Sequence, residues 1–154
     1  MKVNGTHYRS IWFNESNNSV NIIDQRWLPS EFRLATLNNS DQFATAIRDM
    51  WVRGAPLIGA TAAYGVAIEM LTDSSDQALD RVWQKLNETR PTAINLRWAL
   101  DRCRNYLASL KADSRPKAAL QLAHQMAEED VETNRMLGVH GLALIQEIAS
   151  RKKQ

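Results

Sequence analysis

The chain has 154 residues, 44% of them hydrophobic and 23% charged, a composition that fits one globular domain with a substantial core and excludes a disordered chain. Nineteen basic and seventeen acidic residues leave a net charge of +2, far below the basic excess of a protein that coats nucleic acid. The single cysteine, Cys103, excludes an internal disulfide and a cysteine-based zinc site. Because the first ten residues contain no apolar signal segment, we expect a cytoplasmic protein.

Residues 1–38 predict short strands. Apolar and β-branched residues gather in His7–Phe13 and in Val20–Asp24, and an Asn- and Ser-rich loop at residues 14–19 separates the two runs. A third and weaker run spans Phe32–Leu37. Three short strands with short connections predict a small three-stranded antiparallel sheet.

From residue 39 to residue 150 the apolar residues recur with a helical period. We expect Ser40 to be the N-cap of the first helix, which would bury Phe43 and Ile47. The next helix, over residues 55–71, is apolar on all faces, as is typical of a central helix. Its proline and glycine residues and its polar flanks favour a buried core helix over a membrane span.

Capping and helix-breaking residues mark the remaining helices. These markers are Ser74 or Ser75 before the third helix, Arg90-Pro91 before the fourth, Ser114 before the fifth, and Gly138 with Gly141 before the last. Residues 151–154 form a polar tail. Strands in 1–38 and helices in 39–150 then make one domain of α+β class, a small three-stranded antiparallel sheet followed by a bundle of about six helices.

The segment Arg53-Gly54-Ala55-Pro56 is the first candidate binding site. An arginine and a glycine stand directly before an apolar helix, whose N-terminus exposes free N–H groups and partial positive charge. Glycine lets a ligand approach the backbone, and arginine adds bidentate recognition of phosphate. The alternative is a loop with a solvated arginine.

The segment Arg90-Pro91-Thr92 repeats this pattern, with Asn95 close by. The same anion-binding argument applies, and so does the alternative of a capped helix start. The spacing of the two segments in sequence does not show whether they converge on one phosphate.

No catalytic or metal site is predicted. His124 and His140 are too far apart in sequence to suggest a metal pair, and Cys103 falls on an apolar helix stripe, which favours a core residue over a nucleophile. The acidic run at residues 128–130 is most simply a solvated turn of helix. No glycine-rich dinucleotide loop and no P-loop is present, so we expect no cofactor.

Four segments resemble motifs of the methylthioribose-1-phosphate isomerase family. They are Asp24-Gln-Arg-Trp-Leu-Pro29, Val52-Arg-Gly-Ala-Pro-Leu-Ile-Gly-Ala-Thr-Ala-Ala-Tyr-Gly65, Arg90-Pro-Thr-Ala-Ile-Asn-Leu-Arg-Trp-Ala99, and the stretch that joins Glu129-Asp130, Asn134-Arg135 and Gly138-x-His140-Gly141. Together they cover the whole chain in the family's order. Ribose-1,5-bisphosphate isomerase and the regulatory subunits of the eukaryotic initiation-factor exchange factor share this fold.

The resemblance implies that Arg53, Gly54, Ala55 and Arg90 bind a sugar phosphate and that this domain catalyses nothing alone. It also implies a Rossmann-like second domain, absent from these 154 residues, that carries the family's catalytic cysteine and aspartate. We therefore expect the N-terminal substrate-binding domain of an aldose–ketose isomerase of methionine salvage, inactive by itself and associating as a homodimer.

Two alternatives remain open at this point. One is a non-enzymatic interaction module related to the translation regulatory subunits, and the other is a domain like that of ribose-1,5-bisphosphate isomerase. The Arg-Gly-Ala-Pro and Arg-Pro-Thr-Ala motifs favour the sugar-phosphate isomerases. We expect neither a nucleic acid nor a membrane as a partner.

Overall fold

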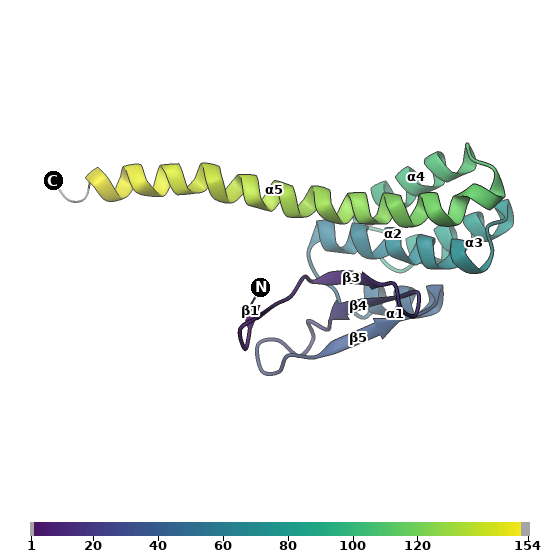
Figure 1. Cartoon of the computed structure of the whole chain (residues 1–154), viewed down its shortest axis with the longest axis horizontal. Coiled ribbons are helices and arrows are strands. Elements are labelled where there is room, and N and C mark those ends of the chain that lie inside the picture. The colour runs from purple at the N-terminus through teal and green to yellow at the C-terminus, as the bar shows by residue number, and fades with distance from the viewer. Residues whose placement is uncertain (1, 152–154) are drawn as a thin grey trace.

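A small sheet lies against a group of helices, and one long helix extends well beyond both (Figure 1). The computed structural model describes residues 2–151. The strands are β1 (Lys2–Val3), β2 (Thr6–His7), β3 (Ile11–Asn14), β4 (Ser19–Ile23) and β5 (Leu34–Leu37). The helices are α1 (Ser40–Arg48), α2 (Ala55–Thr72), α3 (Asp76–Asn87), α4 (Ile94–Ala108) and α5 (Arg115–Arg151), with one 3-10 turn at Ala112–Ser114. The predicted α+β class is confirmed.

Strands β3, β4 and β5 form the predicted antiparallel meander. Ile11 pairs with Ile22, and Val20 pairs with Leu37. All four of these side chains are buried, so one face of the sheet joins the core. The predicted first strand, His7–Phe13, is wrong as a single element, because the chain leaves β2 at His7 and begins β3 at Ile11.

A two-stranded hairpin of β1 and β2 precedes this sheet and was not predicted. Its turn is Asn4-Gly5, where both residues have a positive φ, 49° and 81°. An Asn-Gly pair between two short runs is the strongest short-range signal for such a turn, because both residues tolerate the left-handed conformation.

The N-cap of α1 is Asn39 and not the predicted Ser40. The Asn39 side chain accepts a hydrogen bond from the backbone N–H of Gln42 at 3.0 Å. Ser40 is the first helical residue, and its hydroxyl accepts a hydrogen bond from Nζ of Lys85 at 3.1 Å. At the other end of α1 the N–H of Trp51 bonds to the carbonyl of Ala46 at 2.9 Å, and the chain turns through Met50 at a φ of 56°.

Helix α2 is the centre of the domain, as the sequence predicts. It is long and apolar enough to cross a membrane by length and composition, yet 67% of that segment is buried inside the structure. Helices α1, α3, α4 and α5 all pack against it. Two glycines allow close approach: a Cβ on Gly59 would stand 3.2 Å from the carbonyl oxygen of Asn95 in α4, and one on Gly65 would stand 3.0 Å from Leu86 in α3.

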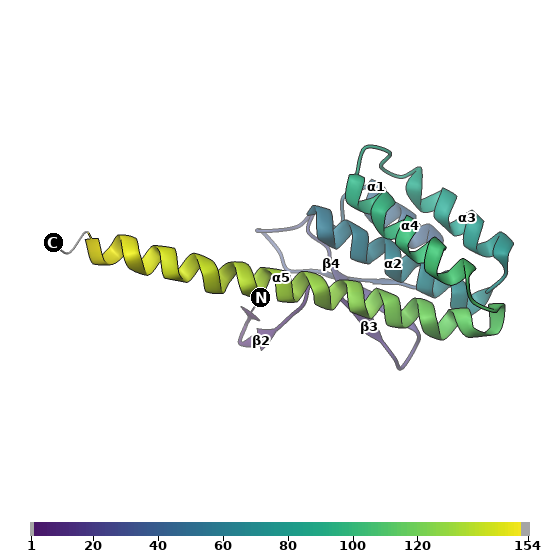
Figure 2. The ribbon, with the colours of Figure 1, turned by 90° about the horizontal axis from the view of Figure 1, so that it is seen from above.

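The predicted break at Gly138 and Gly141 is wrong, because α5 runs without interruption for 37 residues. Its first part packs on α2 through Ala119, Leu122 and Met126. Beyond residue 134 the helix extends away from the rest of the domain (Figure 2). The side chains of residues 135–140 and 142–151 are exposed. Residues 152–154, most of the predicted polar tail, lie outside the described residues.

Candidate functional site

Arg53 and Arg90, 37 positions apart in sequence, line the same cavity. We call it the arginine cavity; its volume is about 500 Å³, within the range of small-ligand sites. All four residues predicted to bind substrate, Arg53, Gly54, Ala55 and Arg90, belong to its wall. The other lining residues are Met50, Ile58, Thr92, Ala93, Ile94, Asn95 and Leu96.

Two helices start at the arginine cavity, and neither has a side-chain cap. The N-cap of α2 is Gly54, whose φ of 99° is strained for any other residue type, and the N-cap of α4 is Ala93. The first N–H groups of a helix need acceptors, and an anion can supply them. Both helices therefore present unsatisfied donors and partial positive charge to one space.

The close contact between α2 and α4 holds the two helix starts together. Gly59 lies one turn into α2 and meets the backbone of Asn95, which lies one residue into α4. A side chain at position 59 would displace α4. Glycine at this position thus sets the spacing between the Arg53 and Arg90 segments.

The loop that carries Arg53 is fixed from the sheet side by the segment after β4. The N–H of Gln25 donates to the carbonyl of Trp51 at 2.9 Å, and the Arg26 guanidinium lies 4.2 Å from the centre of the Trp51 ring. Asp24 in turn accepts hydrogen bonds from Arg26, and these bonds hold the pKa of the Asp24 carboxyl below its usual value. The Asp24–Pro29 segment therefore contacts the loop that carries Arg53 through Gln25 and Arg26.

Within residues 2–151, the two cavity arginines have no carboxylate partner. Ten of the thirteen arginines form ion pairs with Asp or Glu. Among residues 2–151 the exceptions are Arg48, Arg53 and Arg90. Arg115 illustrates the usual pattern: it is buried and donates to Asp76, Leu107 and Ser74. Guanidinium groups are the side chains that recognise phosphate and carboxylate groups most specifically.

No described residue of the arginine cavity wall is an acid, a histidine or a cysteine. Thr92 supplies a hydroxyl and Asn95 an amide, and both groups can donate and accept hydrogen bonds. In the described part of the chain, no cluster of His, Cys, Asp or Glu is placed to hold a metal ion. The described wall thus combines guanidinium and hydrogen-bonding groups, and its side chains include no carboxyl, imidazole or thiol group for proton transfer.

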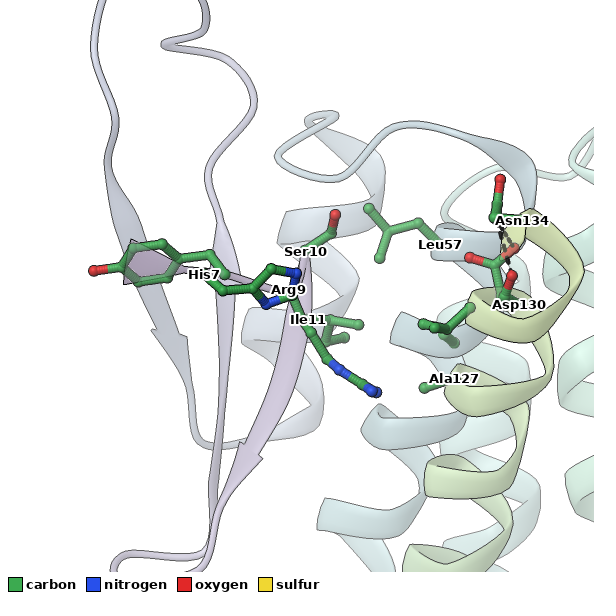
Figure 3. Close-up of a pocket in the computed structure, with 11 residues that line it drawn as sticks. His7, Arg9, Ser10, Ile11, Leu57, Ala127, Asp130 and Asn134 are labelled. Carbon is green, nitrogen blue, oxygen red and sulfur yellow. Dashed lines mark hydrogen bonds between the residues drawn. The ribbon is translucent and has the colours of Figure 1, made fainter. Parts of the chain in front are cut away.

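Two further cavities lie beside the first two turns of α2. One, of about 260 Å³, is lined by Gly59, Trp98 and Asp130 among others. The second, of about 420 Å³, lies between the β2–β3 segment and α5; Figure 3 shows Arg9 on one side and Asp130 and Asn134 on the other. The Asn134 amide donates to the Asp130 carboxylate at 3.1 Å. Arg9 is paired with Glu128, so the described lining of this cavity offers no unpaired arginine comparable to Arg53.

The two titratable groups that burial perturbs most lie in the core and outside these cavities. Burial raises the pKa of the Cys103 thiol to about 12, and that of the Tyr64 phenol to about 12 as well. Cys103 is 1% exposed, which confirms the prediction of a core residue over a nucleophile.

Sequence reasoning found both arginine segments but missed the apolar part of the cavity wall. Met50 and Ile94 line the arginine cavity, although large fractions of both side chains, 46% and 83%, are exposed. Met50 matches the core period of the first helix, and Ile94 lies between motif residues. The spacing of Met50 and Ile94 in the sequence therefore does not predict a contact with a ligand.

The chain is similar in sequence to known proteins. The sequence profile described as the initiation factor 2 subunit family matches residues 51–150. A methylthioribose-1-phosphate isomerase of Brucella anthropi is 63% identical over 153 residues, which are 99% of this chain and 42% of that protein. The chain spans about two fifths of the length of the first curated relatives it matches.

Two crystal structures share the fold. The 5-methylthioribose 1-phosphate isomerase of Pyrococcus horikoshii matches with a TM-score of 0.79 and 36% identity, over 86% of this chain and 39% of that chain. The delta subunit of translation initiation factor eIF-2B from A. fulgidus matches with a TM-score of 0.81 and 34% identity, over 90% and 42%.

Proposed function

The chain belongs to the initiation factor 2 subunit family, and on that premise we propose that it is the N-terminal, substrate-binding domain of a methylthioribose-1-phosphate isomerase. Such an enzyme converts 5-methylthioribose 1-phosphate to 5-methylthioribulose 1-phosphate. The observation that carries the proposal is the convergence of Arg53 and Arg90, both without carboxylate partners, on the uncapped starts of α2 and α4.

In this proposal the arginine cavity binds the phosphate of the sugar. A phosphate group accepts charge-assisted hydrogen bonds from guanidinium groups and from the first N–H groups of a helix. The absence of a side chain on Gly54 lets the phosphate approach the backbone of the first turn of α2. Holding the phosphate at two helix starts fixes the position of the sugar carbons.

Proton transfer belongs to groups outside the arginine cavity wall. The isomerisation moves a proton between adjacent carbons of the sugar, which requires a positioned acid and base. No side chain of the described wall can serve as either. We therefore expect a protein made of residues 1–154 alone to bind the sugar phosphate and not to isomerise it.

The eIF-2B-like structure supports a second candidate, a non-enzymatic module that docks a protein. The two functions make different demands on the arginine cavity. A sugar-phosphate site needs unpaired cations beside a concave surface, as found at Arg53 and Arg90, whereas a docking module has no need of a ligand there. The isomerase function is favoured on this ground.

Calorimetric titration of the 154-residue chain tests the proposal. We expect 5-methylthioribose 1-phosphate to bind and raise the melting temperature, and 5-methylthioribose without phosphate to bind at least tenfold more weakly, because the charged contacts are to the phosphate. Equal binding of the two sugars, or binding of neither, would contradict the phosphate site and favour the docking module.

We further propose a cytoplasmic homodimer that binds neither nucleic acid nor membrane. Burial of α2 in the domain centre supports the absence of a membrane partner. Among residues 2–151, ten arginines form ion pairs with carboxylates, which supports the absence of a nucleic-acid partner.

A further inference from the structure

Met50 adopts a backbone conformation that methionine disfavours. Its φ is 56°, in the left-handed region, and it directly follows the last turn of α1. Glycine or asparagine usually occupies this position of a helix end, because a larger side chain meets the backbone there. Strain of this kind at a cavity is a reason to look for a function of the side chain.

Packing of the Met50 side chain within the domain does little to offset this backbone strain. It is 46% exposed, so nearly half of its surface contributes no packing energy. The part that is enclosed lines the arginine cavity. Neither backbone preference nor core packing therefore explains a methionine at this position.

Ile94 is a second exposed apolar residue beside the arginine cavity, and it lies on α4. It is the first residue of α4, it is 83% exposed, and it lines the same cavity. The buried side chains of Ile58 and Leu96 continue this apolar surface into the cavity wall. The cavity thus combines a cationic part, Arg53 and Arg90, with an apolar part.

We propose that Met50 and Ile94 are specificity-determining residues that contact an apolar substituent on the sugar phosphate. This inference rests on the proposed function, and it assigns the methylthio end of the substrate to the apolar part of the wall. Arg53 and Arg90 take the phosphate. A ligand with a hydroxyl in place of the methylthio group satisfies only the cationic part.

Three probes separate the two parts of the cavity: 5-methylthioribose 1-phosphate, ribose 1-phosphate and inorganic phosphate. The first two differ in the methylthio group, and the third reports the arginines alone. Titration of the 154-residue chain gives the preference for the methylthio sugar as a ratio of two Kd values. Burial of one small apolar group corresponds to a preference of about tenfold.

The test variants are Met50→Asn and Ile94→Thr. Asparagine tolerates the left-handed conformation, and threonine keeps the β-branched shape at the helix start. We expect each variant to lower the preference for the methylthio sugar by about threefold to fivefold and to leave the affinity for inorganic phosphate unchanged. Met50→Asn should also raise the melting temperature by a few degrees, because it relieves backbone strain.

Leu34→Thr is the matched control. Leu34 is also 46% exposed, but it lies in β5, away from the arginine cavity. Its substitution should leave the preference unchanged.

Three outcomes would overturn the inference. An unchanged preference in both variants would show that Met50 and Ile94 do not contact the substituent. A parallel loss of phosphate affinity would show that they act through the arginine loops. Loss of stability in Met50→Asn would show that methionine is kept for packing. Failure of the unmodified chain to bind either sugar phosphate would instead overturn the proposed function together with this inference.

Discussion

The phenol oxygen of Tyr64 lies 2.9 Å from Nδ1 of His124, and this hydrogen bond joins α2 to α5 across sixty positions of sequence. The Tyr64 side chain is buried, and the two rings meet edge to face at 5.6 Å. The Phe13 ring of β3 packs against the other side of the imidazole. The sheet, the central helix and the long helix therefore meet at His124.

Tyr64→Phe should lower the free energy of unfolding by about 1 kcal/mol. The variant keeps the ring and its packing but leaves the imidazole nitrogen without its partner. Urea unfolding followed by circular dichroism measures the change. Tyr106→Phe is the control, because the Tyr106 side chain is 47% exposed. Equal losses of unfolding free energy in both variants would show that the Tyr64–His124 hydrogen bond contributes no more to stability than an exposed tyrosine hydroxyl.

Stability should fall as the pH rises above about 9. Burial raises the pKa of Cys103 from 9.0 to about 12 and that of Tyr64 from 10.0 to about 12 in the folded protein. In this range the unfolded chain releases these protons first, so deprotonation favours unfolding. Each group contributes a slope of up to about 1.4 kcal/mol per pH unit between its ordinary pKa and its folded pKa.

Comparison of the unmodified chain with Cys103→Ala isolates the thiol. Between pH 8 and pH 10 the unfolding free energy of Cys103→Ala should decrease less steeply than that of the unmodified chain. Identical slopes would mean that the thiolate is tolerated in the folded core. In addition, a thiol reagent at pH 8 should modify Cys103 only after the protein unfolds.

Arg53→Ala and Arg90→Ala should each reduce kcat/KM by about tenfold to a hundredfold, the loss expected for one charged hydrogen bond to phosphate. A chimera supplies the activity: residues 1–153 of this chain replace the matching part of the Brucella anthropi enzyme. Melting temperatures should stay the same, because neither arginine is paired within the domain.

Arg48→Ala is the matched control for that series. Arg48 also has no carboxylate partner among the described residues, but it lies at the end of α1 and does not line the arginine cavity. An effect of Arg48→Ala as large as the other two would show that overall positive charge, and not the site, governs the rate. Arg97→Ala, on α4 but outside the cavity wall, provides a second control.

The exposed part of α5 should drive self-association. Leu142, Leu144, Ile145 and Ile148 are each more than half exposed, and apolar surface of this extent favours contact between copies. We expect sedimentation to show a dimer of the 154-residue chain at micromolar concentration, and Ile145→Glu to shift it to a monomer.

Ser150→Glu adds the same charge about 140° around the helix from Ile145. This control should leave the dimer intact. Monomeric sedimentation of the unmodified chain at all concentrations would contradict the proposed association through α5.

The sequence predicted the elements well where a local pattern decides them. The β-branched run at Val20–Asp24 was predicted as a strand and the continuous apolar run of α2 as a central helix, and both are present. The break at Gly138 and Gly141 was predicted wrongly, because a glycine within a helix costs only about 1 kcal/mol and does not end it. Asn39 and Ser40 are both good N-caps, and the pattern does not choose between them.

The binding site was predictable only in part. Each arginine segment is visible as an arginine before a helix start, but their convergence depends on how α2 packs on α4. That packing rests on the contact between Gly59 and Asn95, which no local period reveals. The apolar part of the wall was missed for a similar reason. The spacing of Met50 fits a core position of α1, but α1 ends at Arg48, before Met50.

The contact between Gly59 and Asn95 also couples the arginine cavity to a residue outside its wall. A Cβ at position 59 would stand 3.2 Å from the carbonyl oxygen of Asn95, so α2 and α4 would have to separate by a few tenths of an ångström. Gly59→Ala would therefore weaken phosphate binding by separating Arg53 from Arg90, with every cavity residue unchanged. Variation at this one glycine is a route by which related domains can lose the sugar phosphate and keep the fold.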